Sequence, residues 1–254
     1  MNYLLDYLLI FFTALLTFIR SIRNDFVFDD QEAIIKNKDL QDVDVMKVFQ
    51  NDFWGTNIAA DSSHKSYRPL TVIVYQLIAK FVAINNQTSL SSRSLDPFPF
   101  HCINLLAYCL CCCCVYLTVQ NWLKSRLISS KEFRQFALKI TLFFTIHPLH
   151  CEPVFFEYKK TIINDKLFIL YSKVSTCVGL ADILSALCSL ISLNCFLSNL
   201  DLYESYSHGS FGKWIVIQLN IILFAFASML FKEQGITILV IYIIIIGIYI
   251  HNDS

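Results

Sequence analysis

Hydrophobic residues along the chain are gathered into seven runs that are separated by polar stretches. The runs lie at about 4–19, 70–84, 102–119, 136–149, 183–197, 214–231 and 236–250. A helix that crosses a bilayer needs roughly 17–25 mostly apolar residues, so the pattern predicts a bundle of membrane-spanning helices. Two runs fit less well. The run at 70–84 is short and contains Lys80, and the run at 136–149 reaches membrane length only with the polar residues before it.

The composition predicts an all-α polytopic membrane protein. Of the 254 residues, 56% are hydrophobic and 16% are charged, whereas a soluble domain carries about 25% charged residues. The 20 basic residues balance the 20 acidic ones, so the chain lacks the basic excess that is typical of nucleic-acid binding. Most of the cysteines lie inside apolar runs, where free cysteine packs as a small hydrophobic residue, and no spacing typical of a zinc site occurs.

The first run resembles a signal peptide, but it lacks a positively charged start and a cleavage site of small residues. We interpret it as an uncleaved first span that also targets the chain to the endoplasmic reticulum membrane. The basic stretch between the third and fourth runs is predicted to be cytoplasmic by the positive-inside rule. Its cations are Lys124, Arg126, Lys131, Arg134 and Lys139.

Counting crossings outward from this basic stretch places the residues before about 101 in the lumen. Because the first span also delivers the chain to the lumen, the run at 70–84 is predicted not to cross the membrane. It would lie along the membrane surface, or dip in and return. The alternative is that 70–84 does cross, which would place the basic stretch in the lumen. A glycosylation sequon at Asn86 agrees with the first topology, since such acceptors are used only in the lumen.

Under this topology the ionisable residues near the span ends gather on the luminal side. Charged groups at membrane depth are costly, so such a gathering predicts a shared functional site. The candidate residues are Asp29, Asp30, Arg68, His147, His150, Glu152, Asp182, Lys232 and Glu233.

The acidic members of this set allow several kinds of chemistry. Asp29 and Asp30 could take a proton from an attacking hydroxyl or hold a divalent cation, or they could belong to a solvated acidic loop. In the segment "HPLHCEP", His147, His150 and Glu152 could bind a phosphorylated ligand, a sugar or a metal. Proline after His147 disturbs the helical spacing that a metal site would use, and the alternative is an interfacial helix end.

The basic members suit an anionic ligand. The guanidinium of Arg68 matches a phosphate through two parallel hydrogen bonds, and Lys232 offers a point charge. Either side chain could instead be an anchor that reaches the membrane surface. Asp182 begins a span, where it could be a helix N-cap as well as a ligand.

Seven segments, taken in order, look like the N-terminal half of the transmembrane and tetratricopeptide-repeat (TMTC) protein O-mannosyltransferases. The resemblance implies a partial helical bundle of the GT-C glycosyltransferase type over 1–254, with a first luminal loop at about 20–101 and without the tetratricopeptide repeats. The segments are "FVFDDQEAIIKNKDL", "NDFWGTN", "HKSYRPLTV", "FHCINLLAY", "FTIHPLHCEPV", "GLADILSAL" and "KEQGITIL".

The same resemblance implies an activity and its residues. The donor would be the membrane lipid dolichyl-phosphate-mannose, and the acceptors would be Ser/Thr hydroxyls of secretory-pathway proteins, with cadherin-like domains as the known class. Asp29 or Asp30 would be the base. Luminal basic groups, with Arg68 and Lys232 matching in kind, would hold the donor phosphate. No metal or other cofactor is expected, because the leaving group carries a single phosphate.

Three departures from the family pattern leave a second hypothesis open. Leu180 stands where the family has an arginine, residues 155–176 have no family counterpart, and the chain stops soon after "KEQGITIL". The sequence therefore predicts either a mannosyltransferase, in a truncated form, or a non-catalytic membrane scaffold derived from that family. A transporter or channel is disfavoured, because charged residues cluster at span ends and not along mid-span faces.

Overall fold

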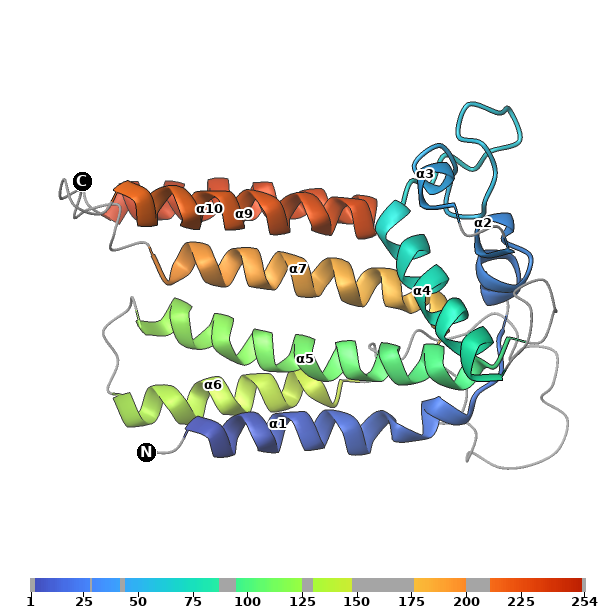
Figure 1. The fold of residues 1–254 in the computed structure, drawn as a ribbon. Coiled ribbons are helices and arrows are strands. Elements are labelled where there is room, and N and C mark those ends of the chain that lie inside the picture. The colour runs from blue at the N-terminus through green and yellow to red at the C-terminus, as the bar shows by residue number, and fades with distance from the viewer. Residues whose placement is uncertain are drawn as a thin grey trace, which may run out of the picture.

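The computed structural model describes residues 3–27, 29–41, 44–86, 95–124, 130–147, 176–199 and 211–252. In this described part of the chain six helices lie side by side, and successive ones run in opposite directions (Figure 1). They are α1 (Tyr3–Phe18), α5 (Pro97–Lys124), α6 (Ser130–Thr145), α7 (Leu180–Leu197), α9 (Phe211–Phe231) and α10 (Thr237–Asn252). The chain is therefore an all-α polytopic membrane protein, as the sequence predicted.

Membrane-crossing length is reached by four helical segments of the described chain. They are Tyr3–Arg23, Pro97–Leu123, Cys177–Leu197 and Trp214–Phe231, each long and apolar enough to span by length and composition. Glu233–Ile248 is a shorter apolar helix. Polar residues at the start of α6 lower its hydropathy, yet α6 packs in the same layer as α1 and α5 (Figure 1).

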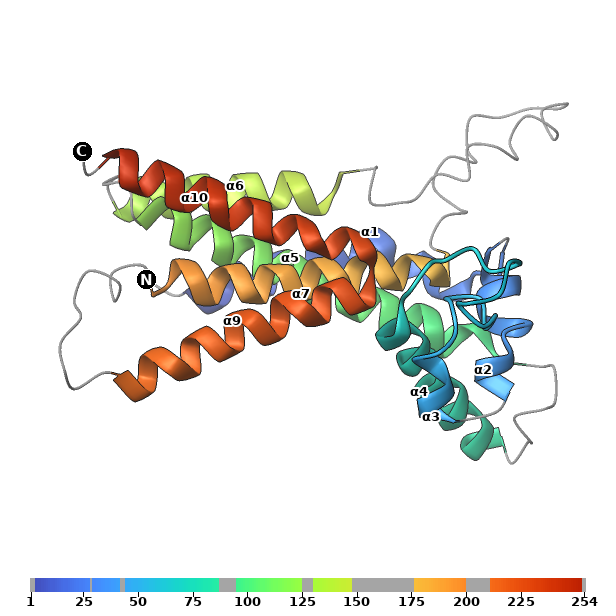
Figure 2. The same cartoon turned by 90° about the horizontal axis from the view of Figure 1, so that it is seen from above.

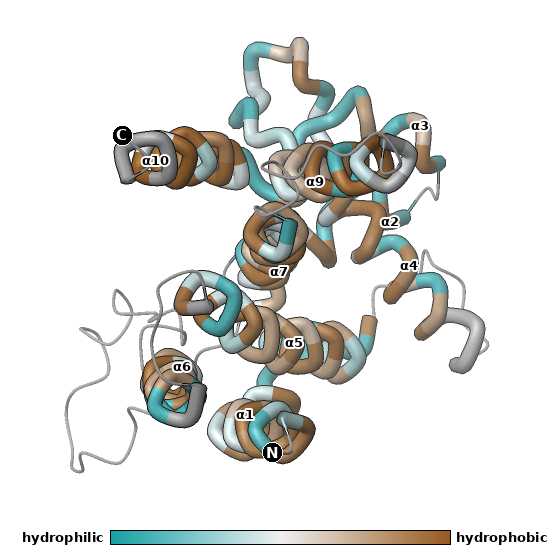
Figure 3. Tube along the Cα trace, turned by 90° about the vertical axis from the view of Figure 1, so that its left-hand side faces the viewer, coloured by the Kyte–Doolittle hydropathy of each residue, from teal (hydrophilic) through white to brown (hydrophobic). Residues whose placement is uncertain are grey.

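The side chains of the bundle are distributed as expected for a protein surrounded by lipid. Large apolar side chains of α9 point outward, and Leu219 and Ile222 are 60% and 63% exposed. Polar groups instead join the helices inside, where Ser185 of α7 lies 3.0 Å from the hydroxyl of Ser228 in α9. Hydrogen bonds of this kind hold helices together in membranes, where lipid removes the hydrophobic drive for association. Figure 3 shows the apolar colouring along α1, α5, α9 and α10.

Short elements gather at one end of the bundle, which we call the loop end, while both termini lie at the opposite end (Figure 1). The chain leaves α1 through the turn η1 (Ile19–Arg23). The elements that follow are a turn of π-helix, η2 (Gln31–Ile35), and the helices α2 (Lys38–Gln41), α3 (Val45–Val48) and α4 (Pro69–Asn86). The described part of the predicted first loop thus contains short helical turns, and turns and extended backbone connect α3 to α4 over 49–68.

Helix α4 lies at the loop end and is inclined to the long helices (Figures 1 and 2). It touches the end of α9, where the Thr71 hydroxyl donates to the Phe231 carbonyl over 2.8 Å. This is the placement that a non-crossing 70–84 segment requires, and the topology itself stays a prediction.

A small hydrophobic core holds the loop end together. Phe53, Tyr75 and Phe100 are fully buried, and the ring of Tyr75 lies 6.0 Å from that of Phe100 and 6.2 Å from that of Phe53. The buried carboxylate of Asp52 accepts hydrogen bonds from four groups of the segment 54–64. Burying a carboxylate is costly unless it accepts hydrogen bonds. The four hydrogen bonds to Asp52 therefore favour one conformation of the segment 54–64.

Candidate functional site

The two adjacent aspartates of the first loop have different surroundings. Asp29 is exposed, whereas Asp30 is fully buried. One carboxylate oxygen of Asp30 accepts from the Val27 N–H over 3.1 Å, and the other accepts from the Val178 N–H over 2.9 Å. Burial raises the pKa of Asp30, and the backbone hydrogen bonds oppose that shift. Asp30 therefore joins the first loop to the start of α7, and Asp29 is the carboxylate that is open to solvent.

Asp182 lies in the first turn of α7 and forms an ion pair with Lys232, which follows α9. The N-cap of α7 is Gly179, so the N-cap alternative for Asp182 is wrong. The Lys232 side chain is 15% exposed and that of Asp182 is 39% exposed. The pair lies on the face where α7 packs against α9, which is the most extensive helix contact in the bundle.

Arg68 lies just before α4 and pairs with Glu233, with 3.1 Å between Nε and Oε2. Its guanidinium also stacks 4.8 Å from the centre of the Phe53 ring, and Ser66 donates to Glu233 over 3.0 Å. Burial would raise the pKa of Glu233, but its backbone hydrogen bond, the charge of Arg68 and the Ser66 hydroxyl outweigh burial and lower it. Arg68 is therefore held by contacts on two sides, and the alternative that it anchors the chain at the membrane surface stays open.

The two ion pairs are neighbours, since Lys232 and Glu233 are consecutive in the chain. The structure thus brings Arg68, Asp182, Lys232 and Glu233 together at the loop end, which are four of the nine candidates from the sequence. Each cation is balanced by a carboxylate, so an arriving phosphate would have to share or replace that partner.

His147 is not brought to the same place. His147 follows α6, and its ring lies edge-on to Phe143 at 5.7 Å. Helix α6 packs on α5 and α1, and α5 and α7 lie between it and α9 (Figure 3). His150 and Glu152 lie outside the described residues.

Several buried polar residues of the loop end were not predicted from the sequence. The Tyr75 hydroxyl donates to the Cys177 carbonyl over 2.9 Å, and the Asn104 amide donates to the Thr176 carbonyl over 3.1 Å. The ring nitrogens of His101 lie 3.6 Å and 3.7 Å from the Cys177 sulfur. The available signal was the presence of polar residues inside apolar runs, which are costly unless they find partners.

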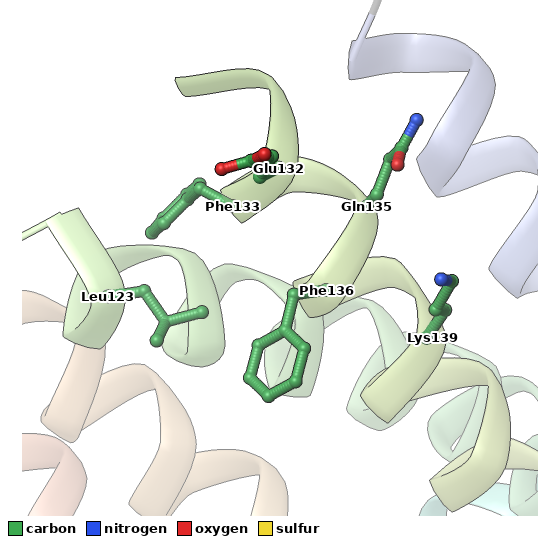
Figure 4. A pocket seen from close by; sticks show the side chains of 6 residues that line it. All are labelled: Leu123, Glu132, Phe133, Gln135, Phe136 and Lys139. Atoms are coloured by element: carbon green, nitrogen blue, oxygen red, sulfur yellow. The ribbon is translucent and has the colours of Figure 1, made fainter. Parts of the chain in front are cut away.

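The described residues of this site form no metal-binding cluster, and the pocket described next lies away from it. Among the described residues, no group of three or more His, Cys, Asp or Glu side chains is placed to hold a metal ion. A pocket shown in Figure 4 lies near the opposite end of the bundle, between α5 and the start of α6. It is lined by Leu123, Glu132, Phe133, Gln135, Phe136 and Lys139.

Comparison with known proteins identifies one group of relatives. The chain is 34% identical to protein O-mannosyl-transferase TMTC4 of Mus musculus over 241 residues, which cover 91% of this chain. It is 31% identical to Tmtc3 of Drosophila melanogaster and 33% identical to TMTC3 of Homo sapiens, over 92% and 84% of this chain. By sequence, the chain belongs to the TMTC family.

The similarity covers only part of each relative. The chain spans 28% of the mouse TMTC4 sequence, 23% of the fly Tmtc3 sequence and 18% of the human TMTC3 sequence. No family model and no solved structure matches the chain.

Proposed function

We propose that this TMTC chain carries the donor-side residues of a protein O-mannosyltransferase. It would transfer mannose from dolichyl-phosphate-mannose to Ser/Thr hydroxyls of secretory-pathway proteins, at the luminal face of the endoplasmic reticulum membrane. The observation that carries the proposal is the joint placement of Asp29, Arg68 and Lys232 at one end of a bundle whose relatives are named protein O-mannosyl-transferases. The cadherin-like acceptor class comes from the family resemblance.

Asp29 is the base in this proposal. Asp30 is fully buried and both of its oxygens already accept backbone hydrogen bonds, whereas Asp29 is open to an acceptor. Asp29 would take the proton of the Ser/Thr hydroxyl as its oxygen forms a bond to the anomeric carbon of mannose. The bond between that carbon and the phosphate oxygen breaks, and dolichyl phosphate leaves with the electron pair.

Arg68 and Lys232 would bind the phosphate of the donor and of the leaving group. A guanidinium fits a phosphate with two hydrogen bonds, and a partly buried cation acts strongly on charge that develops nearby. Because Glu233 and Asp182 pair with these cations, phosphate binding would exchange one anionic partner for another.

Replacing the proposed base tests the assignment. In the full protein in microsomes, Asp29→Asn should lower mannose transfer to a Ser/Thr acceptor by about 100-fold or more, since a general base contributes roughly that much. The matched control is Glu32→Gln, which removes another exposed carboxylate of the same loop that pairs with Lys36. Equal transfer by wild type and Asp29→Asn, at equal expression, would remove Asp29 from the mechanism.

One observation favours the scaffold alternative. Leu180, at the position where the family has an arginine, is 1% exposed and belongs to the hydrophobic core of the loop end. If the chain is a non-catalytic scaffold, the purified protein should fail to retain dolichyl-phosphate-mannose and should co-purify with a membrane partner. Saturable donor binding that is weakened by Arg68→Met would exclude this alternative.

A further inference from the structure

The backbone just before α7 is held by side chains from three separate parts of the chain. Asn104 of α5 donates to the carbonyl of Thr176 over 3.1 Å, and Tyr75 of α4 donates to the carbonyl of Cys177 over 2.9 Å. Asp30 of the first loop accepts from the N–H of Val178 over 2.9 Å. Three consecutive residues are therefore bound from three directions.

These contacts are made away from solvent. Asp30 and Tyr75 are fully buried, and Asn104 is 3% exposed. A hydrogen bond to a buried charged or polar group is expensive to break, because the group left behind has no water to replace its partner. The three side chains therefore hold this backbone more firmly than exposed contacts of the same number would.

We propose that Asp30, Tyr75 and Asn104 are positioning residues that together form a backbone clamp, and that this clamp sets the distance between the proposed base and the phosphate-binding cations. The inference rests on the proposed function for its catalytic meaning. The clamp is defined as the hydrogen bonds of these three side chains to residues 176–178.

Two short connections lead from the clamp to the reacting groups. Asp29 precedes Asp30, so fixing one Cα holds the next about 3.8 Å away. On the other side, Asp182 lies in the first turn of α7, just after residues 176–178, and holds Lys232. A shift of the α7 start relative to the first loop would therefore move the base away from the cation.

The first experiment measures the clamp directly, by hydrogen exchange of the full protein in nanodiscs. Asp30→Ala should speed amide exchange at Val178 and Val27 by about tenfold or more, because each amide loses a charged acceptor. Asp29→Ala, at the adjacent exposed position, is the matched control and should leave both amides unchanged. Unaltered exchange at Val178 in Asp30→Ala would overturn the clamp.

The second experiment measures positioning, with Tyr75→Phe as the mild variant. Removing one hydroxyl should lower kcat by about tenfold to 100-fold, since small misplacements of reacting groups are costly, and should leave KM for the donor nearly unchanged. The control is Tyr67→Phe, whose exposed hydroxyl donates to the Phe49 carbonyl over 3.3 Å.

The outcomes separate the inference from the function beneath it. Faster exchange with an unchanged kcat in Tyr75→Phe would overturn the positioning role, since a purely structural clamp does not alter the rate of the folded enzyme. A wild-type protein that transfers no mannose would refute the proposed function, and the exchange experiment would still decide whether the clamp exists. If Asp30→Asn abolished mannose transfer while Asp29→Asn transferred mannose at the wild-type rate, Asp30 would be the base and its positioning role would be overturned.

Discussion

Arg134 of α6 donates two hydrogen bonds to Asp6 of α1, from Nε to Oδ2 over 2.5 Å and from Nη2 to Oδ1 over 2.8 Å. The hydroxyl of Tyr116 in α5 donates to the same carboxylate over 2.5 Å. The Asp6 side chain is 7% exposed and that of Arg134 is 15% exposed. One buried charge cluster thus joins three helices, including α6, the most polar of the long ones.

Breaking this pair should destabilise the bundle. Asp6→Asn leaves the guanidinium of Arg134 without its counter-charge, so it should lower the free energy of unfolding. The double variant Asp6→Leu with Arg134→Leu should recover most of that loss, because no lone charge remains. Thermal unfolding of the detergent-solubilised protein measures both. Lys139→Met, at an exposed cation of α6, is the control and should change little. A double variant as unstable as Asp6→Asn would contradict the explanation.

Glycan mapping at Asn86 should reveal the compartment of the first loop. The sequence topology places this sequon in the lumen, so the microsomal protein should lose mass when treated with an endoglycosidase. Asn86→Gln should remove the shift. If Asn86 stays unmodified while a sequon introduced into the basic stretch between α5 and α6 is glycosylated, the orientation is reversed and 70–84 crosses.

Leu180→Arg should destabilise the protein, even though the family pattern that the sequence resembles has an arginine at this position. Leu180 is almost fully buried among apolar side chains, and an unpaired charge in such a place costs several kcal/mol. Leu180→Met keeps the volume and should cost less than about 1.5 kcal/mol. A Leu180→Arg protein as stable as wild type, with stronger donor binding, would show that the site accepts the family arrangement.

Acid should weaken the contact between Arg68 and Glu233. The pKa of Glu233 is lower in the folded chain than its ordinary value of 4.5. The ionised carboxylate therefore stabilises the fold above pH 4.5, and this stability is lost as the pH falls through the lower pKa of the folded state. Thermal stability measured between about pH 3 and pH 6 should therefore fall less on acidification in Glu233→Gln than in wild type. Identical pH dependence in the two proteins would show that the pair adds no stability.

Much of the candidate site follows from reading the sequence. Asp182, Lys232 and Glu233 flank apolar runs, and alternating helix directions bring such flanks to one end of the bundle. The histidine segment was grouped with them for the same reason. The structure separates His147 laterally, because a count of crossings gives the end at which a residue lies but not its position around the bundle.

The choice between Asp29 and Asp30 could not be made from the sequence. Both belong to the same acidic stretch, and only packing of the first loop against the start of α7 buries one and leaves the other exposed. The pairing of Arg68 with Glu233 joins residues 165 positions apart in the chain. Such a contact depends on α4 lying across the end of α9.

The sequence by itself determined that this protein is helical and lies in a membrane, because lipid requires backbone hydrogen bonds to be satisfied within each apolar segment. It also determined which charged residues stand at the ends of those segments. Only the tertiary structure decided the lateral order of the helices, and with it the partner of each charge and the burial of Asp30. Hydropathy encodes depth in the bilayer, whereas lateral order arises from side-chain packing and hydrogen bonds between residues far apart in the chain.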